Sequence, residues 1–348
     1  MLGKKNKPFF VAEISSNHNG KISVAKKLIS IAKAGGADAV KLQTFTAKTM
    51  TVNSKKKYFM IKEGLWKGYS LWDLYEKAKT PYNWHKKLFK HAKKIGIKIF
   101  STPFDETAVD FLEKIKCPMY KVASFEMTDI PLIKKIASTK KPMIISTGMA
   151  NLSEISKTYS IAKKYGAKDI TLLYCVSSYP AKDEEFNLNN IKILKKEFKC
   201  TVGFSDHSKN NKIGLAAIAA GAEVIEKHIG LKNQKKGLDI EFSMRGEEIK
   251  KFKNQINETY KYLGKNYFYR NNSENKSKIF RRSIFSIADI KKGEKFTKRN
   301  IKRIRPGFGL EPIYFESLLN KKCPINISKH SPLTGKILKK LNINFGDK

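Results

Sequence analysis

The chain has 348 residues, of which 41% are hydrophobic and 11% aromatic, and this composition predicts a globular protein rather than a disordered one. Its formal net charge is +39, but the lysines are spread along the whole chain, so we expect no specific nucleic-acid binding. The sequence has no long apolar run and no apolar signal core at its start, so we expect a cytoplasmic protein with no membrane contact.

Short apolar segments alternate with helical patterns along most of the chain. The predicted strands are 9–15, 39–45, 98–103, 119–124, 142–148, 170–178, 201–207 and 223–229. Helices are predicted between them, for example at 24–37, 106–116, 151–166 and 211–222. Eight strand–helix units in about 250 residues are typical of a (β/α)8 TIM barrel. A doubly wound open sheet is the competing fold, but no glycine fingerprint follows the first strand.

The pattern also predicts a long loop and a second domain. Segment 46–85 carries many aromatic residues and is too long for an ordinary connection, so we expect it to cover the mouth of the barrel. We therefore predict a barrel domain at 1–269, a polar linker at 270–280, a small, mostly β domain at 281–340 and a tail at 341–348.

Polar and charged residues gather where the predicted strands end. In a TIM barrel these ends meet on one face, which is where active sites lie. The residues at or just beyond these ends are Glu13, Lys41, Gln43, Thr102, Lys121, Ser124, Glu126, Ser146, Thr147, Ser177, Tyr179, Ser205, His207 and His228. Loop chemistry alone explains a few such positions but not a set drawn from all eight ends.

The residue types in this set indicate the ligand. Lys41 and Lys121, together with several hydroxyls, suit a compact polyanion such as a phosphate ester. His207 and His228 can bind a catalytic divalent metal, for which we expect Mn²⁺, with Mg²⁺, Co²⁺ or Zn²⁺ as substitutes. The alternative for each histidine is a hydrogen bond to a loop carbonyl. The four cysteines are scattered without a CxxC pair, which predicts reduced thiols and no zinc ribbon.

The motifs AEISSNHNG, VKLQT, STPFD, YKVASFE, ISTGMA, SSYP, GFSDHS and EKHI, in this order, resemble the sialic acid synthase family. Members of that family are transferases that condense phosphoenolpyruvate with an amino sugar to form nine-carbon ulosonic acids. The segment that begins RRSIF and continues to RPGFG resembles the antifreeze-like domain of the family. The 58–85 loop, Phe125 and Ser177 resemble the pseudaminic acid synthases of this family more than the N-acetylneuraminate synthases.

The resemblance implies a role for each site residue. It implies that His207 and His228 bind the metal and that Glu13 transfers protons, although Glu13 could instead be only an ion-pair partner of Lys41. The implied phosphoenolpyruvate-binding residues are Lys41, Thr102, Lys121, Ser124, Ser146, Ser177 and Ser205. The implied sugar-binding residues are Gln43, Glu126, Tyr179, Asp239 and Arg305. A solvated loop position is the alternative for Asp239.

The resemblance also implies an assembly. In the family, the arginine that matches Arg305 reaches the active site of the partner subunit and contacts an acylamino group of the sugar, which implies a homodimer with swapped C-terminal domains. The implied product is pseudaminic acid; N-acetylneuraminate and legionaminate are the alternatives. Another phosphoenolpyruvate-dependent aldol-type synthase and a non-catalytic nucleic-acid-binding barrel remain further alternatives. We interpret His18 as a loop-organising residue, and His85 and His91 as surface positions.

Overall fold

The computed structural model describes residues 7–264 and 267–343. The chain divides into two compact units, Met1–Gly264 and Lys265–Lys348, which we describe separately. The parts of the predicted domains that fall on residues 1–6, 265–266 and 344–348 lie outside the described residues. Among the described residues, none of the helices combines the length and the apolar character needed to cross a bilayer.

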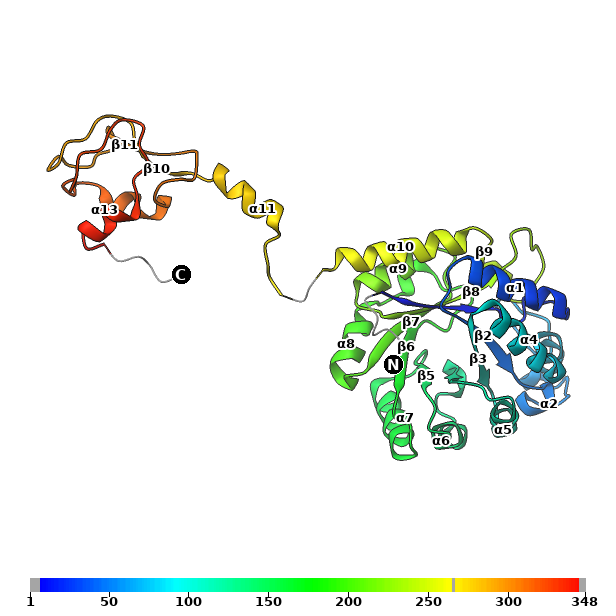
Figure 1. Cartoon of the computed structure of the whole chain (residues 1–348). Helices are drawn as coiled ribbons and strands as arrows, with labels where there is room; N and C mark the ends of the chain where they lie inside the picture. The colour runs from blue at the N-terminus through cyan, green and yellow to red at the C-terminus, as the bar shows by residue number, and fades with distance from the viewer. Residues whose placement is uncertain (1–6, 265–266, 344–348) are drawn as a thin grey trace. The chain divides into compact units, whose positions relative to one another are not determined.

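The first unit is a closed parallel barrel, which confirms the predicted fold (Figure 1). Its strands are β1 Phe9–Glu13, β2 Ala39–Thr44, β3 Lys98–Pro103, β4 Tyr120–Val122, β5 Met143–Ser146, β6 Ile170–Cys175, β7 Thr201–Asp206 and β8 Val224–Gly230. Each strand pairs with the next, and β1 pairs with β8 to close the barrel. The register sets Glu13 beside both Lys41 and His228, so three strand ends meet at one point.

Helices surround the strands on the outside of the barrel (Figure 1). They are α1 Ile22–Ala34, α2 Ala47–Met50, α3 Leu71–Ala78, α4 Tyr82–Ile95, α5 Glu106–Lys114, α6 Ile130–Ser138, α7 Leu152–Lys164, α8 Asn189–Phe198, α9 Lys212–Ala219 and α10 Glu248–Tyr262. The shorter elements are the 3-10 turns η1 Lys57–Phe59, η2 Ser124–Glu126, η3 Asp183–Glu185 and η4 Ile240–Phe242, and the strand β9 Met244–Arg245. Side-chain caps begin several helices; Asn151 and Glu154 form a capping box on α7.

The barrel strands are buried on both faces, which is why they read as apolar runs in the sequence. The large side chains Phe10, Phe100, Phe204 and Phe252 are fully buried in one continuous core with the helices. Charged residues enter this core only at the carboxyl ends of the strands and at a few outer ion pairs, such as Lys227 with Asp206 at 2.8 Å.

The segment between β2 and α4 contains α2, η1 and α3 and contributes to the wall of the mouth cavity, as the loop prediction expected. The expectation of a surface position for His85 is wrong, because this residue is fully buried. His85 begins the apolar face of α4 together with Leu88 and Ala92. Its Nε2 lies 2.8 Å from the Thr44 hydroxyl, which ties α4 to β2.

The second unit has its own small core around Ile284, Phe296, Ile301 and Leu333. Its elements are α11 Asn272–Lys276, η5 Ser277–Phe280, β10 Ser283–Ser286, β11 Ile301–Ile304, η6 Pro312–Tyr314, α12 Phe315–Leu318 and α13 Gly335–Lys340. β10 and β11 form an antiparallel pair. The segment predicted as a linker at 270–280 contains α11 and η5, and all its residues are exposed. Leu341 and Ile343, assigned to the tail, pack against the core.

Candidate active site

Four buried charged residues form a cluster at the strand ends inside the barrel. Lys41 forms an ion pair with Glu13 on the neighbouring strand. The Nζ atoms of Lys41 and Lys121 each lie 3.6 Å from Oε1 of Glu226 on β8. All four side chains are at most 5% exposed, so water screens their interactions little. Two cations and two anions therefore balance in a site that is shielded from solvent.

This environment shifts the pKa values of the cluster. Burial raises the pKa of Glu13 to about 7, with Glu226 adding to the rise and Lys41 offsetting part of it. Burial would raise the pKa of Glu226, but Lys121 and Lys41 outweigh it and the pKa is lowered. Burial lowers the pKa of Lys121. Glu13 can therefore give up and take a proton near neutral pH, while Glu226 keeps its charge.

Hydroxyl groups surround the two lysines. Lys41 donates a hydrogen bond to Thr102 at 3.2 Å, and Lys121 donates one to Ser146 at 2.7 Å. The hydroxyl of Ser205 donates to Glu226 at 3.2 Å. Ammonium and hydroxyl donors that converge in this way suit the oxygens of a phosphate or carboxylate group.

Ser124 and Ser177 form a small concave surface with Gly148 next to this cluster. A Cβ atom on Gly148 would lie 2.1 Å from Oγ of Ser177, 2.8 Å from Oγ of Ser124 and 3.0 Å from Sγ of Cys175. The Ser177 hydroxyl is buried and has no hydrogen-bond partner among the residues that the structure describes. Because unpaired buried hydroxyls are costly, this donor indicates a place for a ligand oxygen.

The two predicted metal ligands lie close together. The rings of His207 and His228 have centroids 5.8 Å apart, and Phe242 packs against both. Nδ1 of His207 lies 2.9 Å from the carbonyl oxygen of Val176. A carbonyl oxygen accepts hydrogen bonds, so Nδ1 carries the proton of the neutral ring and Nε2 keeps its lone pair. Burial lowers the pKa of His207 to about 4, and it also lowers that of His228, with His207 adding to the effect. Both imidazoles are therefore neutral at pH 7.

These features fit a catalytic cation. Nδ1 of His228 is buried without a hydrogen-bond partner in the described part of the chain, and it lies 3.8 Å from a carboxylate oxygen of Asp239. Within residues 7–264 and 267–343, no group of three or more His, Cys, Asp or Glu side chains is arranged to hold a metal ion. Two neutral imidazoles with open positions around them are typical of a catalytic metal site rather than a closed structural one.

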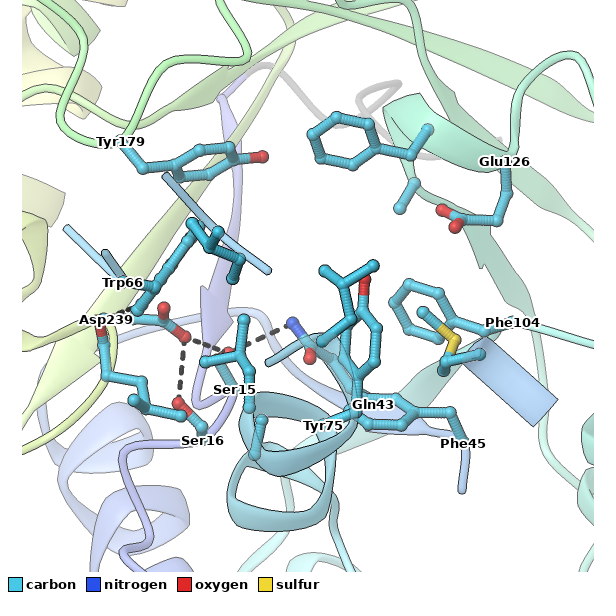
Figure 2. Close-up of a pocket in the computed structure, with 18 of the residues that line it drawn as sticks. Ser15, Ser16, Gln43, Phe45, Trp66, Tyr75, Phe104, Glu126, Tyr179 and Asp239 are labelled. Atoms are coloured by element: carbon cyan, nitrogen blue, oxygen red, sulfur yellow. Dashed lines mark hydrogen bonds between the residues drawn. The ribbon is translucent and has the colours of Figure 1, made fainter. Parts of the chain in front are cut away.

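A cavity of about 390 Å³ opens beside this cluster at the mouth of the barrel (Figure 2). It is lined by Ser15, Ser16, Gln43, Phe45, Met50, Ile61, Trp66, Leu71, Leu74, Tyr75, Ala78, Phe104, Ala123, Phe125, Glu126, Tyr179, His228, Leu238 and Asp239. His228 is the residue that joins this cavity to the histidine pair. The size of the cavity suits a small molecule such as a monosaccharide.

Two groups of polar side chains lie on opposite sides of this cavity (Figure 2). On one side Asp239 accepts hydrogen bonds from Ser15 and from Ser16, and Gln43 donates to Ser15 at 3.1 Å. On the other side Oε2 of Glu126 is buried, with no hydrogen-bond partner in residues 7–264 and 267–343, and burial raises the pKa of this residue to about 7. Both groups are positioned to bind the polar substituents of a ligand.

Two segments of the chain match the models of known protein families. Residues 28–267 match the model of the NeuB family, and residues 281–339 match the SAF domain. The chain belongs to the NeuB family. The antifreeze-like resemblance at the C-terminus corresponds to the SAF match.

Several relatives span nearly the whole NeuB-family chain. A pseudaminic acid synthase from Campylobacter jejuni is 42% identical over 321 residues, which cover 92% of this chain and 94% of the relative. An N,N'-diacetyllegionaminic acid synthase from the same species is 41% identical and covers 90% of this chain and 95% of the relative. The crystal structure of an N-acetylneuraminic acid synthetase from Leptospira borgpetersenii, in complex with citrate, aligns with a TM-score of 0.72 at 31% identity over 79% of this chain and 92% of that one.

The structure brings most of the predicted site residues of this NeuB-family chain into the barrel mouth. Gln43, Glu126, Tyr179 and Asp239 line the cavity, and the seven predicted phosphoenolpyruvate-binding residues lie on the strands and turns beside it. Arg305 belongs to the second unit, where it follows β11 and precedes Pro306. Its role at an active site stays a prediction.

Sequence reasoning missed Glu226, Gly148 and Ser15. The signal for Glu226 was the pair of charged residues Glu226 and Lys227 inside an apolar strand, because alternate strand residues point to opposite faces. Ser15 adopts a left-handed conformation with φ of 41°, and its backbone N–H donates to Glu13 at 2.6 Å. No sequence pattern indicates that contact.

Gly148→Ala tests the concave surface that Gly148 forms with the two serines. The added methyl group is expected to displace the Ser177 hydroxyl and to raise KM for the phosphorylated substrate by roughly tenfold to a hundredfold, since hydrogen bonds to charged groups contribute about 1.5–3 kcal/mol. Steady-state kinetics would measure this. Ser177→Ala is the matched control, and in that background Gly148→Ala should cost less than it does in the wild type, because only the contacts with Ser124 and Cys175 remain. An unchanged KM in Gly148→Ala would contradict the assignment.

Proposed function

We propose that this protein condenses phosphoenolpyruvate with an amino sugar and water to give a nine-carbon ulosonic acid and phosphate. The observation that supports this most strongly is the meeting of two buried lysines, the neutral histidine pair and the mouth cavity at the strand ends. The two lysines suit an anion, and the cavity suits a sugar. The names of the NeuB-family relatives support the same reaction.

Different residues would bind phosphoenolpyruvate and transfer protons. Lys41 and Lys121, with the serines and threonine around them, would hold the phosphate and carboxylate of phosphoenolpyruvate. The C3 carbon of phosphoenolpyruvate would attack the aldehyde carbon of the open-chain sugar, water would add at C2, and phosphate would leave with the C2–O bond broken. Glu13, with a pKa raised to about 7, would transfer protons to and from the reacting oxygens. Burial excludes bulk water from these steps.

His207 and His228 would hold a divalent cation, for which Mn²⁺ is the first choice and Mg²⁺ or Co²⁺ the alternatives. When bound, such a cation polarises a carbonyl oxygen and makes its carbon more electrophilic. The neutral state of both imidazoles and the unpartnered Nδ1 of His228 support this assignment.

For the sugar we propose 2,4-diacetamido-2,4,6-trideoxy-altrose, which makes the product pseudaminic acid. The similarity to a pseudaminic acid synthase over 92% of the chain supports this choice. A legionaminate synthase at 41% identity keeps a related diacetamido sugar as the second candidate. We also propose a homodimer in which Arg305 of one chain serves the site of the other, and the match to an SAF domain is consistent with it.

The experiment measures phosphate release by the purified protein with phosphoenolpyruvate and Mn²⁺. The diacetamido-trideoxy-altrose and N-acetylmannosamine would be compared in parallel, each with and without EDTA. Release with the first sugar alone, and its loss in EDTA, is the expected result. Release with N-acetylmannosamine alone would overturn the proposed sugar. The absence of release with both, and with the diacetamido sugar of the legionaminate synthases, would contradict the proposed reaction.

A further inference from the structure

We propose that Glu126, Tyr75 and the apolar wall beside them form a subsite that binds an acylamino group of the sugar. The apolar wall is defined here as Phe45, Leu74 and Phe104. This inference rests on the proposed function and names the part of the cavity that selects the substrate. It adds a requirement that the reaction itself does not impose, because the proposed cation-binding histidines, and not this subsite, would act on the reacting carbonyl.

Glu126 supplies an acceptor that the protein leaves unused. Its Oε2 atom is buried and has no hydrogen-bond partner among the described residues. A buried carboxylate oxygen without a donor costs free energy, and a ligand N–H or O–H would recover it. Burial raises the pKa of Glu126, and the charge of Lys121 offsets part of this rise without a hydrogen bond to Oε2.

Tyr75 supplies a hydroxyl near that carboxylate. Burial raises the pKa of Tyr75, and the charge of Glu126 adds to the rise, so its hydroxyl stays protonated. Figure 2 shows this hydroxyl directed into the cavity, on the same side as Phe104 and Glu126. A protonated hydroxyl can donate to a carbonyl oxygen.

The apolar wall surrounds these two polar groups with carbon atoms. The ring of Phe45 packs edge-to-face against Phe104 at 5.2 Å and against Tyr75 at 5.8 Å. Leu74 and Ala78 lie one turn apart on α3 and line the same part of the cavity. This surface can bury a methyl group, which contributes about 0.8 kcal/mol per buried carbon.

An acylamino group fits this combination better than the other substituents of a sugar. It carries an N–H for Glu126, a carbonyl for Tyr75 and a methyl group for the apolar wall. A hydroxyl would leave the apolar wall without a partner. A free ammonium group would pair with Glu126 but would bury its remaining donors against carbon, which is unfavourable. The chemistry of the three elements therefore selects an amide that bears a methyl group.

The test compares three sugars in wild-type protein, Glu126→Met and Phe104→Asn. The sugars are the diacetamido-trideoxy-altrose and two analogues, each with a hydroxyl in place of one of the two acetamido groups. We expect wild-type kcat/KM to fall at least tenfold for one analogue. Each variant should reduce that preference to less than threefold, while KM for phosphoenolpyruvate stays within twofold. Glu63→Gln, at an exposed position of the same insertion, should keep the wild-type preference.

The outcomes separate this inference from the proposed reaction. Turnover in which both variants keep the wild-type preference would overturn the subsite and leave the reaction intact. If no sugar is turned over, the proposed reaction fails, and calorimetric titration of the same three sugars still tests the subsite through their Kd values. Equal Kd values for all three sugars in the wild type would overturn the subsite as well.

Discussion

Glu226→Gln is expected to lower the free energy of unfolding by about 3–5 kcal/mol, which is the usual cost of removing one partner from a buried ion pair. Glu226 is buried, faces both Lys41 and Lys121 at 3.6 Å, and accepts a hydrogen bond from Ser205. Without its charge, the two buried ammonium groups are left with Glu13 alone as their acidic partner in this cluster. Urea unfolding of the full chain would measure the loss.

The same substitution is expected to reduce kcat by about a hundredfold, because misplacement of substrate-binding groups by about 1 Å has effects of this size. Glu247→Gln is the matched control, since Glu247 forms an ion pair with Lys232 at 2.8 Å in which both side chains are exposed. The control should change stability by less than about 1 kcal/mol. If the two variants unfold alike, Glu226 does not hold the cluster together.

His207→Ala and His228→Ala are each expected to reduce phosphate release by about a thousandfold, since polarisation of a carbonyl by a metal contributes several kcal/mol. Each substitution removes one of the two proposed nitrogen ligands. A second measurement is the binding of Mn²⁺ itself, which is monitored through the electron paramagnetic resonance signal of the free ion. Both variants should bind Mn²⁺ more weakly than the wild type.

His91→Ala serves as the control for these two variants. His91 lies on α4, away from the cavity, and its Nε2 lies 3.0 Å from the Ser30 hydroxyl. This variant should keep both Mn²⁺ binding and phosphate release. Wild-type Mn²⁺ affinity in His207→Ala or His228→Ala would show that the cation is held elsewhere.

The barrel was predictable because its strands are buried on both faces and therefore appear as apolar runs. Strand β3 has the predicted bounds, and the others differ by a few residues at their ends. Two helix signals were overlooked. Asn271 and Glu274 form a capping box that begins α11 inside the predicted linker. His85, Leu88 and Ala92 have the spacing of a buried helix face, which the lysines between them obscured.

The candidate site was predictable to the extent that strand ends converge in a barrel. That rule brings Glu13, Lys41 and His228 together without any knowledge of side-chain contacts. It does not show which groups pair, because pairing depends on side-chain direction and distance. Glu226 as the shared partner of two lysines and the unpaired oxygen of Glu126 therefore came only from the structure.

The α3 segment has a consequence for how this scaffold can change. The groups assigned to the reaction lie on barrel strands and their immediate ends, whereas Leu71, Leu74, Tyr75 and Ala78 of the cavity wall belong to an insertion between β2 and α4. Leu74 and Tyr75 of the proposed sugar subsite thus belong to a piece of chain that is separate from the strands, whereas Glu126 and Phe104 of the same subsite lie just after β4 and β3. Exchange of this insertion between relatives offers a route to new sugar preferences that leaves the strand-borne groups in place, and loops of this kind tolerate replacement better than strands do.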